Sequence, residues 1–246
     1  MRNGALEGKV ALVTGAGARL GRAVAVDLAA RGCDVVLHAH TSRQGAEDLA
    51  RDLAASGRRA KVLTADLAQV KQTERFARDA RNAFGKVDIL INSAGVFWPT
   101  PLERLNAEEF DAFTAVNLRA PYLLSAELGR WMKRSGGGVI VNLACVSAQR
   151  PWKDYVPYSI SKAGVVALTI GLAKLLAPEV RVNAVAPGTV LPPEGTPPKR
   201  LKELQKRLPL QRLGRPEDLV RAVAYLVEAD FMTGQILHVD GGRSIL

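Results

Sequence analysis

The chain has 246 residues, enough for one α/β domain or at most two with a buried core. Apolar residues make up 48% and charged residues 24%, as in ordinary globular proteins rather than disordered ones. The net charge of +10 comes from arginines scattered along predicted helices, without the aromatic-interleaved basic stripe that indicates nucleic acid binding. No apolar run reaches the roughly 18 residues of a membrane span, and the charged start is unlike a signal peptide.

Apolar runs alternate with amphipathic segments along the chain, which predicts a parallel sheet with helices on both faces. We therefore expect a single α/β domain over residues 1–246, a doubly wound parallel sheet of seven strands. The expected strands are 9–14, 34–38, 61–64, 88–92, 138–143, 181–186 and 235–239. The expected helices are 19–31, 44–56, 69–84, 107–134, 156–177 and 217–229, with a short basic helix at 199–208.

A turn containing Gly15, Gly17 and Gly21 follows the first strand and leads into the first helix. Backbone N–H groups and the positive end of the helix dipole would meet there, an arrangement that binds pyrophosphate. The Gly-x-Gly-x-x-x-Gly spacing differs from the Gly-x-Gly-x-x-Gly of ordinary dinucleotide folds. By itself, the motif is therefore equally consistent with a plain turn.

Tyr158 and Lys162 stand four residues apart in a predicted helix and project from one of its faces. A lysine ammonium beside a phenol stabilises the phenolate and lowers the phenol pKa from about 10 towards neutrality. Such a tyrosine can donate a proton to a carbonyl or imine, or accept one from an alcohol. Isolated pairs with this spacing are mostly surface pairs, so its meaning depends on the other motifs.

Together, and at this separation, the motifs resemble the short-chain dehydrogenase/reductase family over the whole chain. Asp66-Leu67, Asn92-Ser93-Ala94-Gly95 and Pro187-Gly188 match further family motifs. The resemblance implies a Rossmann-like NADP-binding domain in which Tyr158 and Lys162 are catalytic and Asn117 anchors a water that feeds protons to Lys162. The cofactor-binding residues that it implies are Gly15, Gly17, Arg19, Leu20, Gly21, His38, His40, Thr41, Ser42, Asp66, Leu67, Asn92, Ala94, Gly95, Tyr158, Lys162, Pro187, Gly188 and Thr189.

The end of the second strand favours NADPH over NADH. NAD sites place an acid there to hold the ribose 2′-hydroxyl. The segment 38–43 contains no acid, and the first acid after it is Glu47. Arg19, with the hydroxyls of Thr41 and Ser42 and with Arg43, would instead bind a 2′-phosphate. No metal site is predicted, because His38 and His40 have no further ligands nearby in the sequence.

Arg19 in the glycine turn, the His38-x-His40 strand end and the segment 92–102 resemble the pteridine reductase branch of the family. That resemblance implies that Phe97 stacks a planar pterin ring and that Tyr155 lines the pocket. Stacking of an aromatic side chain on a flat heterocycle is physically favourable. The alternative is that Phe97 and Trp98 only pack a loop.

Cys145 is thirteen residues before Tyr158, where the family has serine and the pteridine reductases have aspartate. A thiol is a weak donor and acceptor, so it imitates neither residue well. Covalent catalysis is disfavoured because no histidine is close in sequence. Ser147 could replace the usual serine only if the chain bends after the strand. Cys33 and Cys145 need no disulfide, which suits a cytoplasmic location.

Three functions remain open from the sequence. The first is an NADPH-dependent pteridine or dihydrofolate reductase, which reduces C=N or C=O. The second is a 3-oxoacyl-carrier-protein reductase or another carbonyl reductase, favoured by the tail 210–217 and the basic surface. The third is an NADPH-binding protein with impaired chemistry, suggested only by Cys145. The family implies a lid over a small-molecule substrate at 191–210, where proline-rich 191–198 lacks regular structure, and a homotetramer formed through the long apolar helices.

Overall fold

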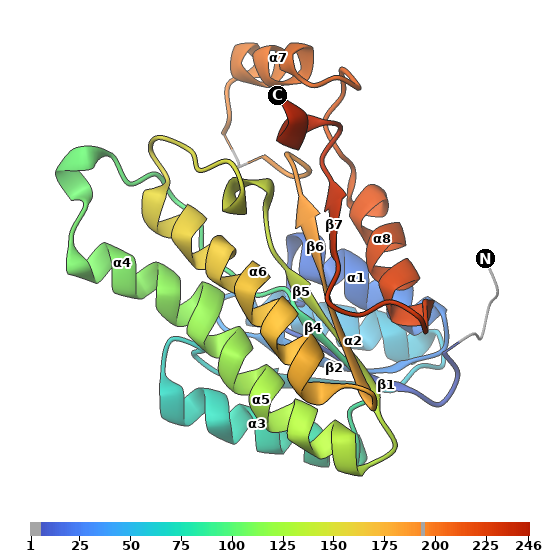
Figure 1. Ribbon diagram of the computed structural model, residues 1–246. Coiled ribbons are helices and arrows are strands. Elements are labelled where there is room, and N and C mark those ends of the chain that lie inside the picture. Colours follow the sequence, from blue (N-terminus) through green and yellow to red (C-terminus); the bar gives the residue numbers. More distant parts are fainter. Residues whose placement is uncertain (1–5, 193–194) are drawn as a thin grey trace.

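Seven parallel strands form one continuous sheet in a computed structural model that describes residues 6–192 and 195–246. The spatial order β3-β2-β1-β4-β5-β6-β7 reverses direction between β1 and β4, and helices cover both faces (Figure 1). This confirms the predicted fold class. The strands are β1 (Val10–Val13), β2 (Asp34–Ala39), β3 (Ala60–Thr64), β4 (Ile89–Asn92), β5 (Gly138–Leu143), β6 (Val180–Pro187) and β7 (Ile236–Val239).

Eight α-helices are present in the described chain, and most begin and end within one or two residues of the predicted positions. Local signals explain this agreement: Gly85, with φ 75°, ends one helix in the left-handed conformation, and Pro198 and Pro216 begin two others. The helices are α1 (Arg19–Ala30), α2 (Arg43–Ala55), α3 (Val70–Phe84), α4 (Ala107–Thr114), α5 (Ala120–Arg134), α6 (Val156–Leu176), α7 (Pro198–Arg207) and α8 (Pro216–Glu228).

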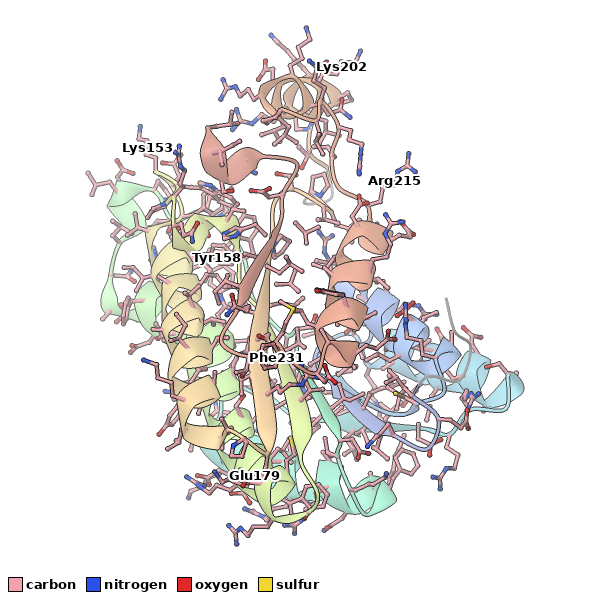
Figure 2. The ribbon with its side chains drawn as sticks, turned by 45° about the vertical axis from the view of Figure 1, so that its right-hand side comes forward. Lys153, Tyr158, Glu179, Lys202, Arg215 and Phe231 are labelled. Atoms are coloured by element: carbon pink, nitrogen blue, oxygen red, sulfur yellow. The ribbon has the colours of Figure 1, made fainter. Side chains whose placement is uncertain are left out.

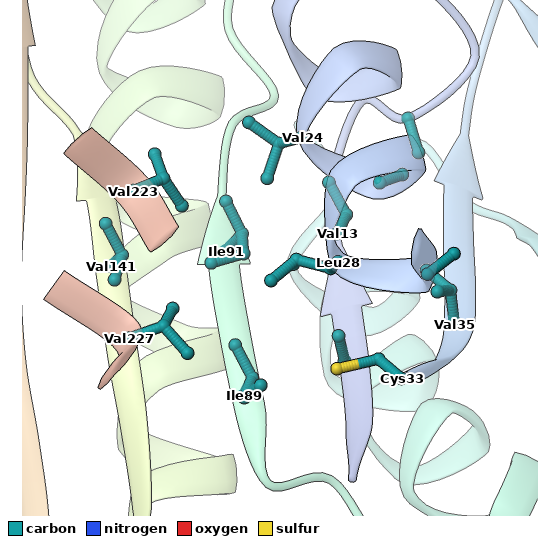
Figure 3. Packing of buried hydrophobic residues seen from close by; sticks show 14 of the residues in the cluster. Val13, Val24, Leu28, Cys33, Val35, Ile89, Ile91, Val141, Val223 and Val227 are labelled. Atoms are coloured by element: carbon teal, nitrogen blue, oxygen red, sulfur yellow. The ribbon is translucent and has the colours of Figure 1, made fainter. Parts of the chain in front are cut away.

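The core has two layers, one on each face of the sheet. Successive side chains of a strand point to opposite faces, so Ala11 and Val13 pack under α1, α2 and α8. Figure 3 shows part of this layer, with Leu28 of α1 and Val223 of α8 beside residues of the central strands such as Val13. Val10 and Leu12 instead join the layer beneath α3, α5 and α6. Burial on both faces explains why a central strand such as β1 is continuously apolar.

The predicted single helix over 107–134 is wrong, because a π-helical segment, η2 (Ala115–Arg119), separates α4 from α5. Pro121 has no N–H and cannot make the α-helical bond to the carbonyl of residue 117. Asn117 meanwhile uses its side chain to bond outside the helix. Such π segments are frequent at functional sites, and Pro121 was the sequence signal for this one.

Helix α6 carries Tyr158 and Lys162 and is, in the part of the chain that the structure describes, the one helix long and apolar enough for a membrane span. The sequence showed no apolar run of that length because Lys162 and Lys174 interrupt this helix. Its residues Leu172 and Leu176 are buried against the sheet, as in a core helix of a folded domain. The predicted irregular loop 191–198 includes residues 193 and 194, which lie outside the described residues.

Candidate active site

Two adjoining cavities open at the carboxyl ends of the strands, where ligands bind in doubly wound folds. The larger has a volume of about 820 Å³ and lies between α6, α7 and the ends of β5 and β6. The smaller, about 410 Å³, lies over the glycine turn and the end of β2. Arg19, Leu20 and Gly95 line both cavities, so an elongated ligand could occupy the two together.

The glycine turn is packed so tightly that its glycines cannot be replaced. A Cβ on Gly17 would lie 2.2 Å from the carbonyl oxygen of Ser42, and one on Gly21 would lie 2.2 Å from that of Gly15. Helix α1 begins directly after this turn without a side-chain cap. Its first N–H groups are therefore suited to an anionic ligand in the smaller cavity.

His38 holds the glycine turn and does not offer a ring nitrogen to a ligand. Its Nδ1 accepts from the Gly15 N–H at 3.1 Å, and its Nε2 lies 3.1 Å from the carbonyl oxygen of Ala65. These partners require the neutral ring with the proton on Nε2. Burial lowers the pKa of His38 to about 4, so the ring stays neutral at pH 7. His38 lines the smaller cavity, as predicted, but both of its ring nitrogens have partners within the protein.

The predicted binding site for a 2′-phosphate is only partly assembled. Thr41, Ser42 and His40 line the smaller cavity, as predicted. Arg19, however, donates to the carbonyl oxygens of Leu191 and, at 3.4 Å, Pro192, at the start of the predicted lid. Arg43 instead forms an ion pair with Glu47, at 2.7 Å, because the two are one turn apart in α2.

Two predicted site asparagines and one glycine border neither cavity. Asn92 is buried and donates to Ser125 Oγ at 3.0 Å and to Asn142 Oδ1 at 2.8 Å, which ties β4 to its neighbours. Asn117 accepts from the Val96 N–H at 2.8 Å and donates to Ser161 Oγ at 3.1 Å. Both are positioning residues in this structure. Gly17 lies behind the turn, against Ser42. The other predicted cofactor-binding residues line one or both cavities.

Tyr158 and Lys162 lie together in the wall of the larger cavity, and Figure 2 shows Tyr158 near the start of α6. The Lys162 Nζ donates to the carbonyl oxygen of Leu143 at 2.7 Å and lies 5.9 Å from the centre of the Tyr158 ring. Burial lowers the pKa of Lys162 from 10.5 to about 8. The ammonium is therefore still mostly protonated at pH 7.

The pKa of Tyr158 moves opposite to the prediction. Burial, followed by the neighbouring Cys145, raises this pKa well above 10. Burial therefore acts against the lowering predicted from Lys162, whose ammonium donates to the Leu143 carbonyl. Tyr158 therefore keeps its proton at pH 7.

Cys145 borders the larger cavity, but Ser147 does not take its place. The strand ends at Leu143, and Cys145 precedes a 3₁₀ turn, η3 (Val146–Ala148), in which its Sγ accepts from the Ser147 N–H at 3.5 Å. The Ser147 side chain is fully buried, and its Oγ has no partner among the described residues. The chain bend therefore turns the serine inward, away from the cavity.

Aromatic rings surround Tyr158. Phe97 stacks on Tyr155, with ring centres 4.7 Å apart and planes 4° apart, and meets Tyr158 edge to face at 4.8 Å. Trp152, which the sequence did not single out, lies nearly parallel to Tyr158 at 6.3 Å. Phe97 is 39% exposed, so it lines the cavity rather than filling the core. Trp98 instead packs on buried Phe113, with ring centres 4.3 Å apart.

Comparison with known proteins gives the family. A family model described as Enoyl-(Acyl carrier protein) reductase matches residues 15–244. An uncharacterized oxidoreductase of Thermotoga maritima is 36% identical and covers 97% of this chain and 98% of its own. A 3-oxoacyl-[acyl-carrier-protein] reductase of Synechocystis is 33% identical, over 97% of this chain and 98% of its own. The chain is a short-chain dehydrogenase/reductase.

Solved structures agree with this assignment. FolM Alternative dihydrofolate reductase 1 from Brucella canis, solved with NADP, is 30% identical, with a TM-score of 0.92. The alignment covers 100% of this chain and 97% of that one. The protein is therefore an oxidoreductase of the short-chain dehydrogenase/reductase type, and its two cavities lie where such a fold binds its ligands.

Trp152 and Arg243 are among the lining residues of this short-chain dehydrogenase/reductase that were missed in the sequence. Trp152 lies in an irregular loop, and Arg243 stands in the last turn, η4 (Arg243–Ile245). The Arg243 guanidinium carbon lies 4.4 Å from the centre of the Trp152 ring, and the group donates to Thr189 Oγ1. No local pattern could reveal them, because 90 residues separate Trp152 from Arg243 before they meet.

Proposed function

We propose that this short-chain dehydrogenase/reductase is an NADPH-dependent reductase of a C=N or C=O bond. The residues present fit the cofactor: the uncapped start of α1, the tight glycine turn and the acid-free end of β2 suit phosphate groups. Thr41, Ser42 and His40 would hold the 2′-phosphate, and Lys162 the nicotinamide ribose hydroxyls. When bound, NADPH supplies the hydride, and the protein supplies orientation and protons.

Tyr158 is the proposed proton donor. Its phenol is protonated at pH 7, as donation to a carbonyl oxygen or imine nitrogen beside it requires. Lys162, held by the Leu143 carbonyl at 2.7 Å, would stabilise the phenolate formed when the proton leaves. Asn117 fixes Val96 and Ser161 on either side of this pair. A water on Asn117 that resupplies protons to Lys162 remains part of the proposal.

A pterin or dihydrofolate is the preferred substrate. The observation that supports it is the stack of Phe97 on Tyr155 beside Tyr158, because rings that stack on each other can stack equally on a flat heterocycle. Likeness to a FolM dihydrofolate reductase over the whole chain supports the same substrate class. We propose that Phe97 parts from Tyr155 and stacks on the substrate ring.

The second candidate is reduction of a 3-oxoacyl thioester. It is favoured by the relative of that name in Synechocystis and by the basic residues Arg19, Lys153, Arg200 and Arg243 around the larger cavity. The third, an impaired NADPH-binding protein, is suggested by Cys145, whose thiol is a weak donor beside Tyr158.

One assay separates the three. Loss of NADPH absorbance is followed with dihydrobiopterin, dihydrofolate and an acetoacetyl thioester. Turnover of the pterins alone supports the first function, and turnover of the thioester alone supports the second. Tight NADPH binding without turnover supports the third. Tyr158→Phe should abolish turnover and leave NADPH affinity nearly intact; comparable turnover in this variant would remove Tyr158 from the mechanism.

We also propose a cytoplasmic homotetramer. Tyr122 on α5 and Ile160, Ile170 and Leu175 on α6 are exposed apolar residues, with Leu175 70% exposed. A second copy covering these helix faces would remove this apolar surface from water. Light scattering after size-exclusion chromatography tests this, and a monomeric mass would refute it.

A further inference from the structure

The larger cavity carries an excess of positive charge at its outer end. Arg200, from α7, and Arg243, from the C-terminal turn, line it together with Lys153. Asp154 is the only acid among the lining residues of the described chain. Figure 1 shows α7 and the C-terminal turn side by side above the ends of β6 and β7. Both arginines therefore belong to the part of the protein that covers the substrate side.

Arg243 is held in place by neutral groups rather than by an acid. Its guanidinium lies 4.4 Å from the Trp152 ring centre and donates to Thr189 Oγ1. Among the described residues no carboxylate forms an ion pair with it. The nearby Asp240 interacts with Arg243 electrostatically but forms no ion pair with it, and its oxygens accept from the Gly242 and Ser244 N–H groups at 2.9 and 2.7 Å.

This arrangement leaves a partly buried cation without an ion-pair partner among the described residues. A guanidinium has five N–H donors, and the bond to Thr189 uses one of them. Burial, together with repulsion from Arg200, lowers the pKa of Arg243, whereas Asp240 and Cys145 act in the opposite direction. An anion beside Arg243 and Arg200 would satisfy the free donors and relieve the repulsion between the two cations.

The position assigns the anion to the substrate and not to the cofactor. Trp152 lies 6.3 Å, ring to ring, from Tyr158, and Arg243 lies against Trp152. Arg243 is thus one aromatic ring away from the proposed proton donor. It does not border the smaller cavity, where the glycine turn and Thr41 would bind the phosphates of the cofactor.

We propose that the substrate carries a carboxylate or phosphate that Arg243 binds, with Arg200 assisting, while its reducible end lies at Tyr158. This rests on the proposed reductase function and adds a requirement to it. Two sources share this chemistry: the glutamate carboxylates of a dihydrofolate and the phosphate of an acyl-phosphopantetheine thioester. Neutral counterparts that lack the anion are dihydrobiopterin and the acetoacetyl thioester of pantetheine.

The test compares kcat/KM for each anionic substrate with that for its neutral counterpart, using NADPH-loaded protein. In Arg243→Gln the anionic-to-neutral ratio should fall about tenfold to hundredfold, as expected for loss of a charge-assisted hydrogen bond, mainly through KM. Arg200→Gln should lower it less, because Arg200 is exposed. Lys202→Gln, on the same helix but outside the cavity lining, is the matched control and should leave the ratio unchanged.

Binding provides a readout that does not depend on turnover. Calorimetry of the NADP-loaded protein with folate and with biopterin should show a folate preference that Arg243→Gln removes and Arg243→Lys partly restores. The same comparison is made for phosphopantetheine and pantetheine. The series in which Arg243→Gln loses the preference, folate over biopterin or phosphopantetheine over pantetheine, identifies the source of the anion. No preference in either series in the unsubstituted protein, or a preference that survives Arg243→Gln, overturns the proposal. Absence of turnover with all four substrates would refute the reductase function alone.

Discussion

The stability of the domain should depend on His38 in acid, because a neutral ring is built into the glycine turn. His38 Nδ1 accepts from the Gly15 N–H at 3.1 Å. Protonation of Nδ1 would place its N–H against the Gly15 N–H, and His38 is only 2% exposed, so water could not relieve the clash. Burial lowers the pKa of His38 from 6.5 to about 4, so between these values the unfolded chain binds the extra proton. Stability contributed by the neutral ring is complete above pH 6.5 and is lost as the pH falls towards 4.

The expected magnitude follows from the two pKa values. Their difference corresponds to about 3 kcal/mol of unfolding free energy, at about 1.4 kcal/mol for each pH unit. Carboxylates such as Asp88 also titrate in acid, so the contribution of His38 is measured as a difference between proteins. The variant is His38→Gln, whose amide can both accept from Gly15 and donate to Ala65 without titrating.

Urea unfolding of both proteins at pH 7, 6, 5 and 4, roughly spanning the window, provides the measurement. The unfolding free energy of the unsubstituted protein should fall by about 3 kcal/mol more than that of His38→Gln. His40→Gln is the matched control, since His40 is exposed at the end of the same strand. Parallel curves for His38→Gln and the unsubstituted protein would refute the assignment of a buried neutral ring.

Three other substitutions test the site. Lys162→Met should remove turnover. Burial lowers the pKa of Lys162 to about 8, so between pH 8 and 10.5 the unfolded chain binds more protons and the unfolding free energy should rise by about 3 kcal/mol. Lys162→Met should lack this rise, and an unchanged rise in the variant would contradict the assignment. Arg19 has a φ of 51°, so Arg19→Gly should raise the unfolding free energy, measured in urea, by about 1 kcal/mol. A lower unfolding free energy would mean that the bonds of Arg19 to Leu191 and Pro192 outweigh this strain. Cys145→Ser should raise kcat by up to about tenfold through a stronger donor beside Tyr158; a lower kcat would indicate that the thiol has its own role.

Features determined by neighbouring residues were predictable from the sequence. The strands are mostly apolar runs, and glycines or prolines mark the helix ends at Gly85 and Pro216, so element bounds agree within about two residues except in the interrupted helix 107–134. The placement of Tyr158 and Lys162 on one face of a helix follows from their spacing alone. The cavity positions of Thr41 and Ser42 follow from the order of the strands.

Features determined by distant residues were not predictable. The direction of the Arg19 side chain depends on the carbonyl of Leu191, 172 residues away. Arg243 reaches the cavity only because β7 returns the chain to the edge of the sheet beside β6. Asn92 was expected at the cofactor, but its contacts to Ser125 and Asn142 are decided by packing between β4, β5 and α5. Helical or strand periodicity in the sequence does not indicate such contacts between distant residues.

The pKa of Tyr158 connects this packing with proton transfer. The sequence suggested a phenol acidified by Lys162, which would serve oxidation and reduction alike. Enclosure by Phe97, Trp152 and Cys145 removes water from the phenol, and burial raises its pKa well above 10. A protonated phenol can give its proton at pH 7, and the neighbouring Lys162 would stabilise the phenolate that remains. The residues that shape the cavity therefore also determine how readily Tyr158 gives up its proton.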